Sequence, residues 1–172
     1  PTIKETALKQ ILNYYNQNHE IFKKIKETEI DVSIENDNYI LLGIIDLLIE
    51  DNGNLEIIDF KTQAKPPLTD PIMEKYKKQL SVYAYILKER YGQTPKKLTL
   101  YWTSEMNKKD SITEFNYDEI YVNNVIKEFD EIINKISNNE FIIKKIPEAK
   151  ICKECDLRFI CSKEGIIKKR RG

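Results

Sequence analysis

Two carboxylates and one ammonium group stand on two adjoining apolar segments of the sequence. Asp46 lies inside the first segment, and Asp59 and Lys61 lie at the end of the second. Because residues i and i+2 of a strand point to the same face, Asp59 and Lys61 share a face and Phe60 points the other way. Carboxylates in apolar surroundings are costly to bury without a partner or a metal. Asp46, Asp59 and the carbonyl of Phe60 are therefore candidate ligands for Mg²⁺ or Mn²⁺.

The turn between these segments brings the charges together. Asn52-Gly53 separates them, and both residues tolerate positive φ, which predicts a β-hairpin that carries Asp46 across to Asp59. A metal held there would acidify a water and polarise a phosphodiester oxygen. Lys61 could position that water or stabilise the developing charge. The alternative interpretation is a solvated ion pair beside a turn, which the apolar neighbours of Asp46 disfavour.

Further strands are predicted on both sides of this hairpin. Residues 29–35 alternate between polar and apolar side chains, which is typical of a half-buried strand. Glu29 begins this strand and is a candidate metal ligand through water. Gly43 interrupts the middle strand, as expected for a bulge or a close approach. Residues 98–103 predict a strand parallel to an earlier one, and 111–116 a weaker strand.

Four stretches predict helical structure. Thr2 and Glu5 form a capping box for a first helix, which should break at residues 16–18 and resume through residue 25. Asp70 and Gly92 mark the two ends of a long helix that carries Gln79 and Tyr83 on one face. Asp118 caps the last helix. Residues 141–172 are expected to be irregular. The fold class is α/β: a mixed sheet, an antiparallel meander plus a parallel strand, flanked by helices.

Composition limits the class of protein. The 172 residues are 41% hydrophobic and 33% charged, with 28 basic and 28 acidic residues. This balance excludes a wholly basic nucleic-acid binder but leaves room for a local basic groove.

We find no apolar run of membrane-span length and no signal peptide, and the chain opens without Met, as a fragment would. The solitary His19 and the basic cluster at 168–171 are interpreted as solvated surface. Three clustered cysteines indicate a reducing compartment, so we expect a cytoplasmic protein.

Three ordered motifs resemble a known family. Gly43-Ile44-Ile45-Asp46, Asp59-Phe60-Lys61-Thr62 and Gln79-Leu80-Ser81-Val82-Tyr83 are similar to the motifs of RecB-type nucleases in the PD-(D/E)XK superfamily, with a restriction-endonuclease-like fold. The resemblance spans roughly residues 25–161. It implies that Asp46 and Asp59 are metal ligands, that Lys61 is the catalytic lysine, and that Gln79 and Tyr83 line the site or contact DNA. Glu29 matches a less regular acidic position.

The cysteines follow the spacing C-x2-C-x5-C, at Cys152, Cys155 and Cys161. In the family that this chain resembles, three such cysteines join an upstream fourth to hold a [4Fe–4S] cluster. Such clusters take four thiolates, so the resemblance places the fourth before Pro1, together with an active-site histidine of the family. Zn²⁺ is the competing interpretation, and cysteines without metal are another. We expect a nuclease core at residues 1–148 and a cysteine-containing tail of the same domain at 149–172.

The resemblance implies a metal-dependent DNA nuclease, of exonuclease type. The expected context is the C-terminal domain of a UvrD/RecB-like helicase in DNA repair and recombination, with helicase domains in the same polypeptide. Single-stranded DNA or duplex ends are the expected substrates, and no membrane is involved. Two alternatives are a free-standing CRISPR-associated RecB-like exonuclease and an inactive nuclease-fold module that binds DNA or a protein.

Overall fold

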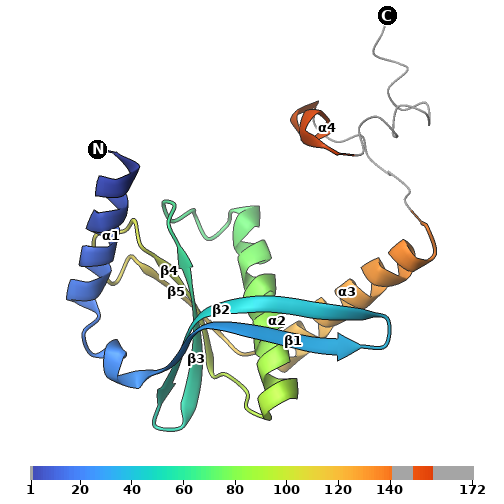
Figure 1. Cartoon of the computed structure of the whole chain (residues 1–172), viewed down its shortest axis with the longest axis horizontal. Coiled ribbons are helices and arrows are strands. Elements are labelled where there is room, and N and C mark those ends of the chain that lie inside the picture. Colours follow the sequence, from blue (N-terminus) through green and yellow to red (C-terminus); the bar gives the residue numbers. More distant parts are fainter. Residues whose placement is uncertain (1, 141–148, 157–172) are drawn as a thin grey trace, which may run out of the picture. The chain divides into compact units, whose positions relative to one another are not determined.

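The computed structural model describes residues 2–140 and 149–156. Contacts divide the chain into two units, Pro1–Ile133 and Asn134–Gly172, and each is described by itself. The first unit is built on a five-stranded sheet in the order β1-β2-β3-β4-β5 (Figure 1). The strands are β1 (Ile25–Asn36), β2 (Tyr39–Asp51), β3 (Asn54–Lys61), β4 (Lys97–Trp102) and β5 (Ile112–Asn116). Strands β3 and β4 pair in parallel and the other neighbours antiparallel, which confirms the predicted mixed sheet.

The hairpin between β2 and β3 forms where the sequence predicts it. Asn52 and Gly53 both take positive φ, 51° and 78°, as a two-residue turn of this hand requires. The start of β1 was predicted four residues too late. The first helix ends at Gln17, as predicted, and helical structure resumes as a short 3₁₀ helix, η1 (Ile21–Lys24). The expected extension to residue 25 is wrong, because Ile25 pairs with Ile49 as strand. Ile25 packs on the sheet beside Ile49, and this tertiary contact overrides local helical spacing.

The first three α-helices begin at their predicted caps, and the second also ends at its predicted cap. Helix α1 (Ile3–Gln17) has the capping box of Thr2 and Glu5. Helix α2 (Pro71–Tyr91) begins at Asp70, whose carboxylate accepts a hydrogen bond from Ile72 N at 2.9 Å, and ends at Gly92 with φ of 65°. Helix α3 (Glu119–Ser137) begins after Asp118, whose carboxylate accepts from the Ile120 and Tyr121 amides.

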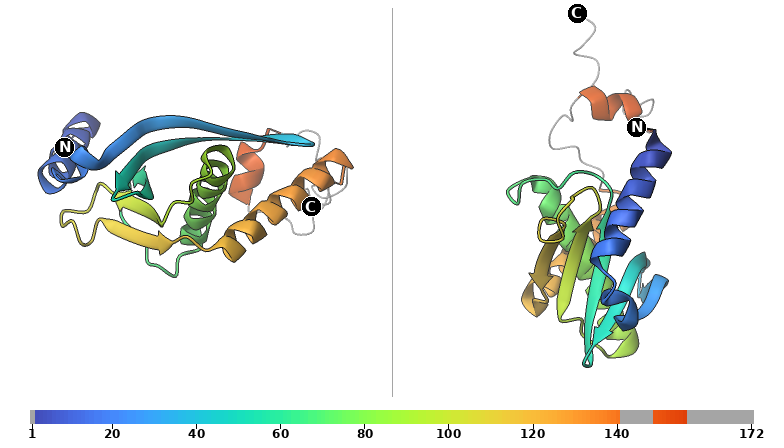
Figure 2. Two further views of the ribbon diagram at one scale, coloured as in Figure 1. Left: turned by 90° about the horizontal axis from the view of Figure 1, so that it is seen from below. Right: turned by 90° about the vertical axis from the view of Figure 1, so that its left-hand side faces the viewer.

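The helices cover the two faces of the sheet differently (Figure 2). Helix α2 and the first half of α3 pack on one face, where they form the larger apolar core with β1 to β4. Helix α1 lies on the other face over a smaller cluster around Leu47, Ile58 and Tyr101. No residue of α1 is buried, and polar side chains such as Gln10 and Asn13 hydrogen-bond the loops after β3 and β4. The long β1–β2 ribbon curves over α2.

The described part of the second unit contains one further helix, α4 (Ala149–Glu154). The expectation of irregular structure is wrong for these residues, whose composition of Ala, Lys and Glu favours a helix. Cys155 is half-buried just after the helix. The side chain of Cys152 and the whole of Cys161 lie outside the described residues. Within the described ranges, no helix has the length and apolar character needed to cross a membrane.

Candidate active site

Asp46 stands where β2 separates from β3. The β2–β3 ladder runs from Asp51 paired with Asn54 to Leu47 paired with Ile58, and Asp46 is the next residue. Its Oδ2 accepts a hydrogen bond from the backbone N–H of Phe60 at 2.8 Å. The carboxylate thus takes the place of a ladder bond at the point where the two strands part.

A break in the alternation of β2 orients this carboxylate. Ile45 and Leu48 both pack in the α2-side core, whereas Leu47 belongs to the cluster on the α1 side. Residues 45 and 47 would share a face in a regular strand, so the two-residue period is interrupted at Asp46. On β1, Glu29 has a φ of +47° between Thr28, which pairs with Leu47, and Ile30, which pairs with Ile45. Such irregularities bend a sheet and redirect side chains, often beside functional sites.

Asp59 and Lys61 form an ion pair on the α2 face of β3. Asp59 is 3% exposed, and its Oδ2 lies 2.6 Å from Lys61 Nζ. Apart from this ammonium, the buried Oδ2 has no hydrogen-bond donor among the described residues. Burial raises the pKa of Asp59 above its usual value, the pairing with Lys61 opposes this, and the charge of Asp46 raises it further. The effect of burial on this pKa is therefore larger than the effect of the ion pair.

Gln79 and Tyr83 extend the polar contacts of Lys61 along α2. Lys61 Nζ donates to Gln79 Oε1 at 3.2 Å, and Gln79 Nε2 donates to the Tyr83 hydroxyl at 2.8 Å. Both amide atoms of Gln79 are therefore engaged, and the two helix residues lie on the face that the sequence predicted. The Tyr83 ring packs over Gly43, where an added Cβ would lie 2.6 Å from its Cε1 atom. The close approach predicted at Gly43 is thus made by an aromatic ring.

A second tyrosine of α2 escaped the sequence analysis as a site residue. The Tyr76 ring lies 4.4 Å from Lys61 Nζ, and its hydroxyl is hydrogen-bonded by the Gln63 side chain. Tyr76 lies on the apolar stripe of α2, the helix face that packs against the larger core. This hydrophobic pattern accounts for a tyrosine at position 76 without reference to the lysine. The available signal was its place three residues before Gln79, which puts both side chains on one helix face.

Other candidate ligands do not join this group. Glu29 is exposed, and among residues 2–140 and 149–156 no three His, Cys, Asp or Glu side chains lie close enough to hold a metal. His19 is exposed, as predicted, and lies edge-on to the Tyr15 ring at 4.7 Å between centroids. The site therefore offers two acidic side chains from β2 and β3.

This donor set fits a hard divalent cation. Carboxylate oxygens are the ligands that Mg²⁺ and Mn²⁺ prefer, and Mg²⁺ commonly keeps several waters while using one or two carboxylates. The buried Oδ2 of Asp59, which has no donor besides Lys61 among the described residues, is the observation that favours a cation here. The Phe60 amide donates to Asp46, and the N–H and C=O of one strand residue point to the same edge, so the Phe60 carbonyl also faces the edge that carries Asp46.

Two known proteins are similar to part of this chain. An ATP-dependent helicase/nuclease subunit of Clostridioides difficile (strain 630) is 30% identical over 82 residues, 47% of this chain and 6% of that protein. The protein of the same name from Clostridium novyi (strain NT) is 33% identical over 84 residues, 45% of this chain and 7% of that protein. The chain thus matches only a small part of the length of these relatives.

Comparison with solved structures agrees on the fold. The crystal structure of a "Putative exonuclease" from Eubacterium rectale aligns with a TM-score of 0.53 and 14% identity over 88% of this chain and 65% of that one. At this identity the likeness concerns the fold alone. The sequence model of the PD-(D/E)XK nuclease superfamily matches residues 2–162, nearly the whole chain. With its mixed sheet and the acidic pair at the parting of β2 and β3, this chain belongs to the PD-(D/E)XK nuclease superfamily.

Proposed function

We propose that this chain hydrolyses DNA phosphodiesters with Mg²⁺ or Mn²⁺ at a site formed by Asp46, Asp59 and Lys61. The observation that carries the proposal is the buried Asp59 carboxylate, whose Oδ2 is paired only with the Lys61 ammonium among the described residues and which shares the hairpin with a second carboxylate, Asp46. Burying a carboxylate in this way costs stability, and a metal-binding role accounts for that cost. Membership of a nuclease superfamily supports the same reaction class.

Each residue has a distinct part in this proposal. Asp46 and Asp59 would hold the metal with the Phe60 carbonyl. A bound divalent metal supplies a more acidic water and a polarised phosphoryl oxygen. Lys61 places a positive charge beside Asp59, where it stabilises negative charge that develops on the phosphate. Gln79 holds the lysine from the helix side.

Tyr83 has a supporting part. Its hydroxyl accepts from Gln79 Nε2, and its ring is fixed against Gly43. The hydroxyl therefore fixes the orientation of the Gln79 amide, which presents its oxygen to Lys61. We infer that Gln79 and Tyr83 also line the surface along which the DNA strand reaches the carboxylates.

The names of the relatives suggest the wider context. Two ATP-dependent helicase/nuclease subunits match part of this chain, which itself corresponds to a small part of their length. We infer that the nuclease acts beside helicase domains in one polypeptide, as an exonuclease on single-stranded DNA or duplex ends during DNA repair. A free-standing exonuclease would have the same site, and an inactive binding module would not need its buried acid pair.

Replacement of Asp59 tests the reaction. Asp59→Ala should reduce Mg²⁺-dependent cleavage of end-labelled DNA at least about 100-fold, because it removes one of two metal-binding carboxylates. The exposed Asp37 is a matched control, since Asp37→Ala removes a carboxylate far along the β1–β2 ribbon. EDTA should abolish cleavage by the wild-type protein. Cleavage by Asp59→Ala at the wild-type rate would show that the assignment is wrong, and wild-type protein without cleavage would favour the binding module.

We also propose that Cys152, Cys155 and Cys161 are three ligands of a [4Fe–4S] cluster whose fourth ligand precedes Pro1. A short segment that cannot form a core of its own gains order from such a cross-link. A longer polypeptide that includes the preceding sequence, purified without oxygen, should be brown and contain about four irons per chain. A colourless protein with one zinc per chain would decide for the zinc site instead.

A further inference from the structure

We propose that Tyr76 is a positioning residue that holds the Lys61 ammonium in place beside Asp59. The inference rests on the proposed function, in which Lys61 is the catalytic lysine. The face of the Tyr76 ring lies 4.4 Å from Lys61 Nζ, within the range of a cation–π interaction.

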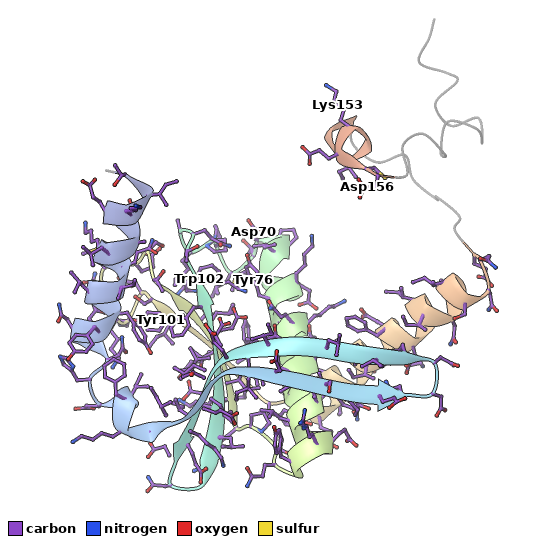
Figure 3. The ribbon with its side chains drawn as sticks, in the orientation of Figure 1. Asp70, Tyr76, Tyr101, Trp102, Lys153 and Asp156 are labelled. Atoms are coloured by element: carbon purple, nitrogen blue, oxygen red, sulfur yellow. The ribbon has the colours of Figure 1, made fainter. Side chains whose placement is uncertain are left out.

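The ring itself is fixed by contacts from three directions. Tyr76 belongs to α2, its hydroxyl is hydrogen-bonded by Gln63, and its edge meets the Trp102 ring at 5.8 Å between centroids and 67° between planes. Figure 3 shows Tyr76 and Trp102 next to one another between α2 and the sheet. Trp102 is fully buried, and its indole N–H donates to Thr113 Oγ1 at 3.1 Å. A rigid aromatic pair therefore stands next to the lysine.

A lysine needs such support because its side chain is long and flexible. The ammonium group has three donors on a four-carbon stem, and fixing that stem costs conformational entropy. Asp59 and Gln79 contact the ammonium with oxygen atoms at 2.6 Å and 3.2 Å, and the ring of Tyr76 contacts it on a further side. Gln79 and Tyr76 hold the charge independently of Asp59. This leaves the Asp59 carboxylate available to a cation without release of the lysine.

A packing role alone would also place a tyrosine in this apolar stripe, and the two roles predict different results. Tyr76→Phe keeps the ring face and removes only the hydroxyl contact with Gln63, whereas Tyr76→Leu removes the ring. If the ring positions the lysine, Phe should retain wild-type kcat within about twofold. Leu should lower kcat roughly 3- to 30-fold with little change in KM, the range that a cation–π contact supports.

Nuclear magnetic resonance provides a test that needs no DNA. A ring face at this distance shields the protons at the end of the Lys61 side chain. We expect the Lys61 ε-methylene resonances to lie upfield in the wild type and in Tyr76→Phe, and to move to ordinary values in Tyr76→Leu. Unchanged Lys61 resonances in Tyr76→Leu would overturn the proposal. If the leucine variant does not fold, Tyr76→Met offers a second side chain without a ring.

A double-mutant cycle with Lys61→Met separates positioning from other effects. Single-turnover cleavage with enzyme in excess should show that Tyr76→Leu costs nothing further once Lys61 is replaced. If Tyr76→Leu lowered the cleavage rate by the same factor in the wild-type and Lys61→Met proteins, Tyr76 would act elsewhere and the proposal would be overturned. Absence of cleavage by the wild-type protein would instead reject the proposed function, while the Lys61 resonances would still decide whether the ring holds the lysine.

Discussion

Asp59→Asn should make the protein more stable in the absence of metal. The carboxylate of Asp59 is almost fully buried, and its Oδ2 has no donor besides Lys61 among the described residues. Asparagine has nearly the same volume and carries no charge, so the replacement removes the desolvation cost without opening a cavity. The variant also loses the ion pair with Lys61, which offsets part of the gain.

The pKa of Asp59 indicates whether the desolvation cost or the ion pair with Lys61 has the larger effect on stability. Burial raises the pKa, Lys61 lowers it, and the net direction is upward, so the charged form is disfavoured in the folded protein despite the ion pair. After the loss of the pair, Lys61 keeps its contacts with Gln79 and the Tyr76 ring. We therefore expect Asp59→Asn to raise the free energy of unfolding by about 1 kcal/mol at pH 7. For a chain of this size that corresponds to roughly 2–4 °C in Tm.

The pH dependence provides the sharper measurement. Because the pKa of Asp59 is higher in the folded protein than in the unfolded one, the protonated carboxyl favours folding. This contribution to stability is fully present below the unfolded pKa and is lost as the pH rises through the folded pKa. Thermal unfolding with EDTA should therefore show a stability gain for Asp59→Asn at pH 7 that shrinks or reverses at pH 3. Addition of Mg²⁺ should stabilise the wild type and not the variant.

A matched control guards against general charge effects. Asp37 is exposed in the turn between β1 and β2, and Asp37→Asn should change Tm by less than about 1 °C at either pH. The reasoning would be refuted if Asp59→Asn were less stable than the wild type at pH 7 and this loss became smaller at pH 3. That result would mean that the ion pair with Lys61 outweighs burial.

Two further predictions concern the contacts of α2 with the strands. Tyr83→Phe keeps the ring on Gly43 and removes the 2.8 Å bond from Gln79, so we expect a Tm within about 3 °C of the wild type and a several-fold lower kcat/KM for DNA cleavage. A wild-type kcat/KM would show that the hydroxyl has no part in the reaction. Gly43→Ala should displace the Tyr83 ring, lower stability by about 1–3 kcal/mol and reduce cleavage, as measured by urea unfolding and single-turnover rates. Gly92→Ala is its control: it strains a residue with φ of 65° but meets nothing within 4 Å, so it should lower stability and leave cleavage unchanged.

The sequence alone determined the local structure around the site. Asn52-Gly53 specifies the hairpin because its turn needs two residues that accept positive φ. Asp70 and Gly92 specify the ends of α2 because they satisfy amides and carbonyls that the helix leaves unpaired. The shared face of Asp59 and Lys61 follows from the two-residue period of a strand. These features depend on residues within a few positions of one another, which is why they could be predicted.

The tertiary structure decided how these parts meet. The interruption of β2 at Asp46 breaks the strand period, so period-based reasoning could not show how its carboxylate reaches the Phe60 amide. The contact of Tyr76 with Lys61 joins residues 15 positions apart, on a helix and a strand whose relative placement depends on packing. The hydrophobic spacing of α2 accounts equally well for a tyrosine that only packs and for one that faces a charge. Only the seating of α2 on the sheet distinguishes the two, because it fixes which ring lies over the ammonium.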